Sequence, residues 1–296
     1  MTRPTNVSKK SENRTVIQPL FKWAGSKQRM LGQYEPFFFP QEPITRFVDL
    51  FAGGLTMTLW VAERYPDAEF VINDNNTELV ELFRVLAKHE KAVITEWQKC
   101  VNAWVPLDKE GRKAFYYDLR EEYCINYKKS SSTRLAGILL FMLQVNFNGM
   151  WKAYIKCNLR YSTPPGTCTQ NIGFFDVTKI EKVAAVLRKT AIYDVDFGDV
   201  PLQDGDFIYA DPPYRDSIVD YQGGFSEDDQ IRLADYLTSH NGNFAYSNKD
   251  IGDGWYTKHF PGTNIIDLSA KYTAGRGVST IDVKEVLITN FAPLKK

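Results

Sequence analysis

Short apolar runs of strand length recur along the chain, and each ends at a polar or glycine-rich turn. Runs of this length that are rich in β-branched and aromatic residues are typical of β-strands. The predicted strands are Arg46–Phe51, Glu69–Asn73, Thr190–Val195, Asp206–Ala210, Asn243–Ser247, Asn264–Leu268 and Glu285–Thr289.

Amphipathic segments separate most of these runs. Thr77–His89 and Asp176–Lys189 place apolar residues at helical spacing. Ser226, with Asp229 three residues later, has the pattern of a capping box and predicts a helix through Tyr236. Alternating strands and helices predict an α/β fold with a mostly parallel, doubly wound sheet. Ligands of such sheets bind at the carboxyl ends of the strands, which is where the polar turns fall.

One stretch breaks the alternation. Between residues 91 and 169 the pattern indicates helices and loops, with no convincing strand–helix pair. We therefore predict a mostly helical domain at 91–169, inserted into a catalytic domain made of residues 15–90 and 170–296. Residues 1–14 are polar and are predicted to form a disordered tail.

The inserted stretch is also rich in basic residues. Lys109–Arg134 carries seven basic and four acidic residues, which a solvated helix face would explain equally well. Asn146–Phe175 has no acidic residue and contains Lys152, Lys156 and Arg160. This acid-free segment favours contact with nucleic acid, although the whole chain has 36 basic and 36 acidic residues and no net charge.

Composition excludes several other classes of protein. Hydrophobic residues make up 44% of the chain, and no apolar run reaches the roughly 18 residues of a membrane span. The polar start lacks the apolar core of a signal peptide, so we expect a soluble cytoplasmic protein. The four cysteines, at 100, 124, 157 and 168, form no metal-binding pattern with the histidines and predict reduced thiols and no metal.

Asp211, Pro212, Pro213 and Tyr214 directly follow a predicted strand and are the most informative candidate for chemistry. These residue types suit a reaction at the exocyclic amine of adenine, which is a poor nucleophile because its lone pair is delocalised into the ring. An aspartate can accept a hydrogen bond from this amine, the Pro212 carbonyl can accept another, and the tyrosine ring can stack on a base flipped out of the duplex. The competing interpretation is an ordinary turn.

A glycine turn and an acidic residue predict a nucleoside site. Phe51, Gly53 and Gly54 lie between a strand and the apolar segment Leu55–Arg64, and glycines let a ligand approach the backbone. Asp74 ends the next strand, at the spacing of an acid that binds ribose hydroxyls. The three-glycine pyrophosphate pattern is missing, which favours S-adenosylmethionine over a dinucleotide.

Two further segments combine aromatic and polar residues. Trp23 and Lys27, four residues apart before the first strand, could frame the methionine end of such a cofactor, or simply form a surface loop. The segment Asn146–Lys152 contains Asn148 and Trp151 as well, and its amides, lysine and aromatic rings suit base edges and phosphates. A polar turn is the alternative for this segment.

Taken together and in this order, these segments resemble the Dam-like DNA adenine methyltransferases, the α group of amino-methyltransferases. The matching segments are Lys22–Lys27, Leu50–Gly54, Asp74, Asp196-Phe197, Asp211–Tyr214, Phe147–Gly149, Ala245–Lys249 and Lys271–Lys284. Two positions depart from the family pattern: Ser26 replaces a glycine, and the second glycine of the cofactor loop is displaced.

The resemblance implies a Rossmann-like methyltransferase sheet with an inserted target-recognition domain. It implies that Trp23, Lys27, Asp74 and Asp211 contact the cofactor or the target amine, and that Asp196 and Phe197 flank the adenine of the cofactor. Phosphate contacts are expected from Lys152, Lys156, Arg160, Lys271 and Arg276. Neither a metal nor a covalent intermediate is expected, and the protein is expected to act on double-stranded DNA as a monomer or weak dimer.

Four alternatives stay open from the sequence. The chain could methylate cytosine N4, RNA adenine or a protein amide, or it could be a DNA-binding relative without activity. Aspartate at position 211 favours adenine by resemblance, and the basic insert favours nucleic acid over protein. A short palindrome containing GATC is the expected target, because Asn146–Lys152 resembles the recognition loop of enzymes with that site.

Overall fold

The computed structural model describes residues 17–127, 132–153, 161–168, 175–215, 224–274 and 279–294, and within the last two ranges only the backbone of 270–274 and 279–282. Its seven-stranded sheet has the order β3-β2-β1-β4-β5-β7-β6. The strands are β1 (Arg46–Asp49), β2 (Glu69–Asn73), β3 (Thr190–Tyr193), β4 (Phe207–Ala210), β5 (Asn243–Lys249), β6 (Asn264–Ala274) and β7 (Ser279–Thr289). The first five are parallel, and β7 and β6 form an antiparallel hairpin at one edge.

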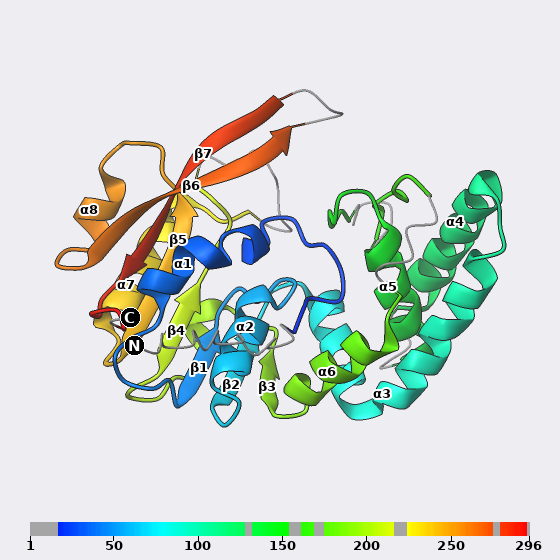
Figure 1. Cartoon of the computed structure of the whole chain (residues 1–296), viewed down its shortest axis with the longest axis horizontal. Coiled ribbons are helices and arrows are strands. Elements are labelled where there is room, and N and C mark those ends of the chain that lie inside the picture. Colours follow the sequence, from blue (N-terminus) through cyan, green and yellow to red (C-terminus); the bar gives the residue numbers. More distant parts are fainter. Residues whose placement is uncertain are drawn as a thin grey trace, which may run out of the picture.

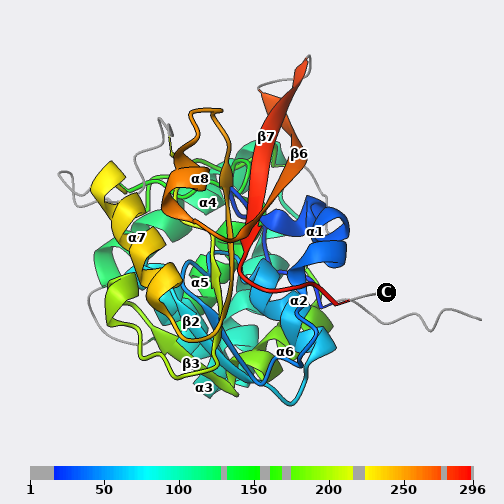
Figure 2. The same ribbon diagram turned by 90° about the vertical axis from the view of Figure 1, so that its left-hand side faces the viewer.

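Helices cover both faces of this sheet, as predicted for a doubly wound fold (Figures 1 and 2). On one face, α1 (Leu31–Phe38) and α2 (Thr56–Arg64) share a hydrophobic cluster with strand residues such as Phe47 and Phe207. On the other, α7 (Glu227–Ser239) and α8 (Trp255–His259) pack on the alternate positions Val48 and Ile208. Strands buried on both faces read as continuous apolar runs, which is why the sequence pattern located them.

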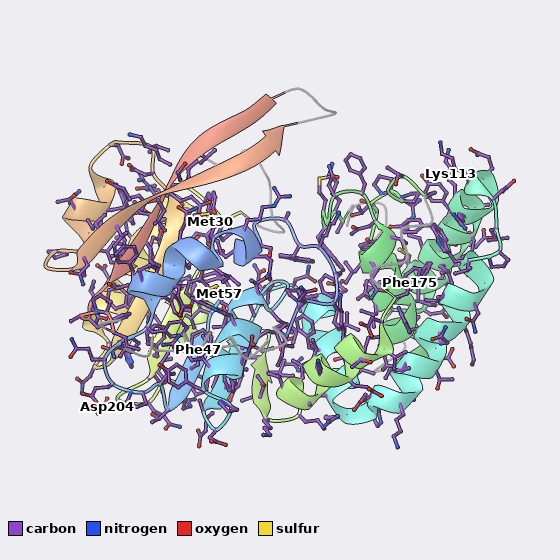
Figure 3. The ribbon with its side chains drawn as sticks, viewed as in Figure 1. Met30, Phe47, Met57, Lys113, Phe175 and Asp204 are labelled. Carbon is purple, nitrogen blue, oxygen red and sulfur yellow. The ribbon has the colours of Figure 1, made fainter. Side chains whose placement is uncertain are left out.

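A helical lobe lies beside the sheet, on the side of β3 (Figure 1). It contains most of α3 (Thr77–Trp104), with α4 (Lys109–Asn126), α5 (Thr133–Val145) and α6 (Val177–Leu187). One hydrophobic cluster runs from β2 through all four helices. Figure 3 labels Phe175 inside this lobe and Phe47, Met30 and Met57 in the sheet lobe.

The helix predicted over Thr77–His89 ends at a kink. α3 runs on to Trp104, but His89 carries non-helical angles of φ −132° and ψ 37°, which divide α3 into two helical parts at this residue. The predicted domain boundary between residues 90 and 91 falls just after this kink. That boundary stays a prediction, because the helix and the hydrophobic cluster both continue across it.

The two last strands are longer than predicted. β6 and β7 extend to Ala274 and from Ser279, and their register pairs Asn264 with Thr289 and Ala274 with Ser279. The predicted ranges covered only the apolar parts near the core. Beyond them the hairpin rises away from the sheet, on the side of the molecule where the loops after α5 also lie (Figures 1 and 2).

Candidate active site

Lys27 joins the start of the chain to the end of β4. It begins the short 3-10 helix η1 (Lys27–Arg29), which Ser26 caps, and its side chain is only 2% exposed. The ammonium donates to Asp211 Oδ2 at 2.5 Å, to Tyr214 OH at 2.9 Å and to the Gly25 carbonyl at 3.2 Å. The sequence places Lys27 at the methionine end of a cofactor; in the structure its ammonium pairs with the carboxylate of Asp211.

Asp211 lies directly after β4, next to the switch point between β1 and β4 where the strand order reverses. Its second oxygen, Oδ1, accepts a hydrogen bond from Ser247 Oγ of β5 at 2.9 Å. Burial raises the pKa of Asp211 above its ordinary value, while Lys27 and Ser247 oppose the increase. The carboxylate is therefore held in a fixed position by donors from two segments that are distant in sequence.

Tyr214 connects this ion pair to a second carboxylate. Its hydroxyl accepts from Lys27 and donates to Glu285 Oε1 at 2.8 Å. Glu285 belongs to β7 and is fully buried. Sequence analysis gave Glu285 no role beyond the start of a strand, although a charged residue inside an apolar strand was a signal that could have identified it.

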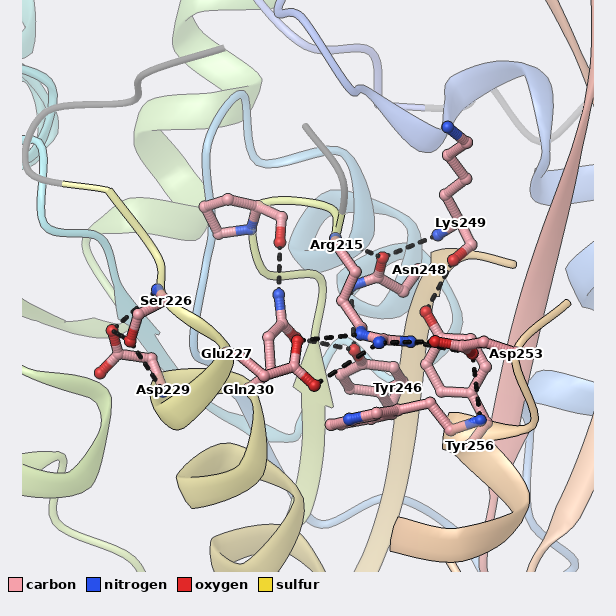
Figure 4. A network of polar contacts seen from close by, with 12 residues as sticks. Arg215, Ser226, Glu227, Asp229, Gln230, Tyr246, Asn248, Lys249, Asp253 and Tyr256 are labelled. Carbon is pink, nitrogen blue, oxygen red and sulfur yellow. Dashed lines mark hydrogen bonds and ion pairs between the residues drawn. The ribbon is translucent and has the colours of Figure 1, made fainter. Parts of the chain in front are cut away.

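A chain of buried hydrogen bonds fixes the backbone on both sides of Tyr214 (Figure 4). Gln230 of α7 donates to the Pro213 carbonyl at 2.8 Å and accepts from the Tyr246 hydroxyl at 3.1 Å. Asn248 Nδ2 donates to Tyr246 OH at 2.9 Å, and Asn248 Oδ1 accepts from the backbone of Arg215 at 3.2 Å. The chain thus begins and ends on the loop that carries the catalytic candidates.

The Arg215 side chain anchors the same loop to α8. It pairs with Asp253 at 2.8 Å and with Glu227 at 3.4 Å, and its guanidinium lies 4.5 Å from the centre of the Trp255 ring. Arg215 is only 8% exposed, so these partners hold a desolvated charge.

The predicted nucleoside loop is tied together by Asp74. One carboxylate oxygen accepts the Gly53 amide at 2.8 Å, and the other accepts the Asn76 amide at 2.9 Å. Burial raises the pKa of Asp74 and these two amides lower it. Asp74 thus joins the loops after β1 and β2, in addition to the ribose contact that the sequence predicts.

The two glycines of this loop accommodate Trp23. A Cβ atom at Gly53, where φ is +44°, would lie 2.7 Å from Trp23 Nε1, and one at Gly54 would lie 2.8 Å from Trp23 Cβ. The predicted reason for the glycines was the approach of a ligand. In the structure the side chain that approaches the loop is Trp23.

Aromatic residues from two loops meet beside this turn. Phe51 and Phe197 have ring centroids 5.9 Å apart, and both contact Phe225. Phe197 is buried, whereas Asp196 is exposed and forms a bidentate pair with Arg232 at 2.6 and 2.8 Å. Hydrogen bonds from Arg232 lower the pKa of Asp196. The predicted pair at 196–197 therefore combines a packed ring with a carboxylate held by an arginine.

Asn146 has a different role from the predicted contact with a base. Its side chain is buried, donates to the Met150 carbonyl at 3.1 Å and to Tyr161 OH at 3.0 Å, and accepts from the Gly149 amide at 3.1 Å. All three bonds hold the turn together. Asn148, at φ +56°, is exposed at the tip of this turn.

The start of the chain contacts the same turn. Ala24 donates its amide hydrogen to the Gly149 carbonyl at 3.1 Å, and the rings of Trp23 and Trp151 lie 6.3 Å apart. Lys152 is exposed just after Trp151. The other predicted phosphate contacts fall elsewhere: Lys156, Arg160 and Arg276 lie outside the described residues, and Lys271 is described only in its backbone.

The described residues were also compared with the patterns of metal sites and membrane-spanning helices. Among the residues described, no group of histidine, cysteine, aspartate or glutamate side chains has the arrangement of a metal site. The helices in this part of the chain are all too short or too polar to cross a bilayer. Cys100, Cys124 and Cys168 are free thiols, and Cys157 lies outside the described residues.

Comparison with protein families gives one match over most of the chain. Residues 23–274 match the family described as D12 class N6 adenine-specific DNA methyltransferase. The matched range includes Trp23, Lys27, the glycine turn, Asp74 and Asp211–Tyr214.

Three individual relatives agree with this match, two of them over nearly their whole length. The chain is 27% identical to the type II methyltransferase M.MjaIII of Methanocaldococcus jannaschii, an alignment covering 93% of this chain and 99% of the relative. It is 27% identical to the type II methyltransferase M1.LlaDCHI of Lactococcus lactis subsp. cremoris, covering 95% and 98%. It is also 27% identical to the Retron Ec67 DNA adenine methylase of Escherichia coli, covering 79% and 78%.

Proposed function

The chain belongs to the D12 class N6 adenine-specific DNA methyltransferase family, and on this premise we propose that Asp211–Tyr214 is the place where a flipped-out adenine is methylated on N6. The enzyme is a DNA adenine methyltransferase that uses S-adenosylmethionine. The observation that carries the proposal is the buried contact of Lys27, Asp211 and Tyr214 at the switch point of the sheet, beside the glycine turn.

Asp211 has the geometry of an acceptor for the target amine. Lys27 and Ser247 each bind one carboxylate oxygen, so the group cannot rotate away, and each oxygen has further lone pairs for an N–H. The Pro212 carbonyl supplies the second acceptor. Two acceptors on the amine hydrogens localise the nitrogen lone pair and point it out of the ring plane. After the new N–C bond forms, the nitrogen loses one proton, which Asp211 can accept.

The residues around the glycine turn fit a nucleoside cofactor. Asp74 keeps lone pairs for ribose hydroxyls beyond its two amide partners, and Phe51 and Phe197 offer apolar ring surface for an adenine. S-adenosylmethionine, when bound, supplies an electrophilic methyl group whose bond to sulfur breaks as the bond to nitrogen forms. The chain's part is to hold the amine in line with that methyl and to exclude water.

Membership of an adenine-specific DNA family argues against cytosine N4, RNA and protein amides as targets. The contact of Lys27 with Asp211 and Tyr214 argues against a DNA-binding relative without activity. A protein that no longer catalyses the reaction has no need for a buried ion pair at this place.

For the target sequence we retain a short palindrome containing GATC. The exposed amide of Asn148 could contact adenine and Lys152 could contact guanine in the major groove, each good contact giving about 1–3 kcal/mol of discrimination. Asn146 no longer takes part, because its amide holds the turn.

Methyl transfer to duplex DNA tests the proposal directly. The protein is incubated with duplex DNA and labelled S-adenosylmethionine, and the digested nucleosides are identified by mass spectrometry. We expect N6-methyladenine, and we expect Asp211→Ala to lower turnover by about 10² or more while the protein stays folded. Asp204→Ala is the control, because Asp204 is exposed in a turn at the outer edge of the sheet lobe (Figure 3).

The site read by the enzyme is tested separately. Expression in a host without adenine methylation, followed by single-molecule sequencing, maps every modified adenine. Methylation confined to a motif other than GATC would refute the target sequence alone. Methylated cytosine, or turnover in Asp211→Ala close to that of the unchanged enzyme, would refute the catalytic assignment.

A further inference from the structure

Glu285 is a buried carboxylate that belongs to none of the motifs found in the sequence. It lies on β7 opposite Lys249 of β5 and Leu268 of β6, and its neighbours Val286 and Leu287 belong to the hydrophobic core. Its relative exposure is 0%. Burial of a carboxylate in such surroundings is costly unless specific contacts compensate for it, and one such contact is the hydroxyl of Tyr214 at 2.8 Å.

Glu285 changes the charge of the active site. Lys27 lies between Asp211, which it binds directly, and Glu285, which it reaches through the shared hydroxyl of Tyr214. A lysine paired with Asp211 alone would leave a site without net charge. With Glu285 the three side chains carry a net charge of −1.

That charge suits the proposed reaction. Positive charge moves from a sulfonium onto the attacking nitrogen during methyl transfer, and a fixed negative environment stabilises positive charge in the transition state. The same carboxylate also determines how the Tyr214 ring is turned, because the hydroxyl accepts from Lys27 and has only one hydrogen to donate.

We propose that Glu285 is a positioning residue for adenine methylation: through the Tyr214 hydroxyl it orients the stacking ring, and its charge keeps the Lys27–Asp211 pair from neutralising the site. The inference rests on the proposed role of Asp211–Tyr214. It adds a residue from the antiparallel hairpin to a site otherwise built at the ends of parallel strands.

Glu285→Gln tests the charge while keeping the shape and an oxygen that can accept from Tyr214. We expect kcat to fall about 10-fold or more, with the KM for S-adenosylmethionine and for DNA changed less than about 2-fold. Glu69→Gln is the matched control, because Glu69 is also a strand glutamate but is exposed at the start of β2. Thermal melting checks that both variants fold.

The pH profile separates the charge from a purely structural role. Glu285 contributes to the raised pKa of Asp211, so its neutral replacement should lower that pKa and move the acid limb of kcat/KM to lower pH. The other groups that face Asp211 are unchanged in the variant: Lys27, Ser247, Tyr34, Tyr209, Tyr246 and Asp49. An enzyme that turns over more slowly but keeps activity at lower pH is the expected result.

Three outcomes would decide against the proposal. Unchanged kcat in a folded Glu285→Gln, or a lower kcat with an unmoved acid limb, would each overturn it. An unchanged enzyme that does not methylate adenine would contradict the proposed function itself and the role of Glu285 with it. If Glu285→Gln does not fold, Tyr214→Phe removes the hydroxyl that connects Lys27 with Glu285 while the charges of both residues are kept. We then expect kcat to fall while the acid limb of kcat/KM stays in place. An unchanged kcat in this variant would overturn the proposal.

Discussion

At the scale of single residues, Asp74 combines a structural contact with a predicted cofactor contact. Its carboxylate holds the Gly53 and Asn76 amides, which join the loops after β1 and β2. We expect Asp74→Ala to weaken S-adenosylmethionine binding by about 1.5–3 kcal/mol, because a charged acceptor is lost. DNA binding should change much less. Titration calorimetry with each ligand measures both effects, and an unchanged cofactor affinity would contradict the role in cofactor binding.

Single residues were predictable where the chemistry is local. Asp211, Tyr214 and Asp74 were proposed as site residues because each follows a strand and carries a distinctive neighbour, and the structure places each at the end of its strand. Glu285 was given no role because its partner Tyr214 is 71 residues away, and the pairing of β4 with β5 and of β5 with β7 brings them together. Asn146 was assigned to DNA because an amide in a polar turn looks the same whether it points outward or holds the turn.

At the scale of elements, the hydrogen-bond chain from α7 through β5 fixes the loop that bears Tyr214. Tyr246→Phe removes the central hydroxyl and keeps the ring. We expect kcat to fall about 10-fold or more, because small displacements of a catalytic group are costly. Tyr236→Phe is the control. It also removes one tyrosine hydroxyl from the same hydrophobic cluster, but this hydroxyl donates to the Val200 carbonyl and not to the hydrogen-bond chain. Equal kcat values for the two variants would show that the chain does not position the loop.

The turn at Phe147–Gly149 permits a close approach of the first residues of the chain. Gly149 has φ +67°, and a Cβ there would lie 2.5 Å from the Lys22 carbonyl oxygen. Gly149→Ala should therefore destabilise the protein more than Gly205→Ala, which has φ +84° but nothing within 4 Å. The backbone strain common to both is about 1–2 kcal/mol. Urea denaturation of the two variants measures the difference, and equal losses would mean that the loop moves aside without cost.

Elements buried on both faces were predicted to within a few residues, and those that leave the core were not. β2 was located at its observed ends because all but its first residue are buried. The outer parts of β6 and β7 were not bounded as strands from the apolar pattern; they fall in Lys271–Lys284, which was matched by resemblance to a late basic hairpin of the family. The part of α3 beyond His89 was predicted only as helical, without bounds of its own, because the kink shifts the phase of the apolar face.

At the scale of the whole molecule, the balance of 36 basic and 36 acidic residues conceals local differences. We expect DNA affinity to fall steeply with salt, because each phosphate neutralised contributes roughly 0.9 to the slope of log K against log salt. Lys152→Ala should reduce this slope by about that amount. Lys189→Ala, exposed before β3 at the opposite end of the sheet from Asp211, should leave it unchanged. A salt response that is flat in the unchanged protein would contradict the predicted phosphate contacts.

The segment Lys22–Ser26 lies between the two halves of the enzyme. Trp23 covers the glycine turn, and the Ala24 amide binds the turn at Gly149. If Trp23 contacts the cofactor and the turn at Gly149 contacts DNA, as proposed, a ligand that orders this segment from one side pre-arranges it for the other, and we expect the two affinities to be thermodynamically linked. Linkage is reciprocal: the factor by which cofactor tightens DNA binding must equal the factor by which DNA tightens cofactor binding, typically about 5–150-fold where sites communicate. Five residues at the start of the fold would then decide whether an enzyme without methyl donor stays on DNA or leaves it.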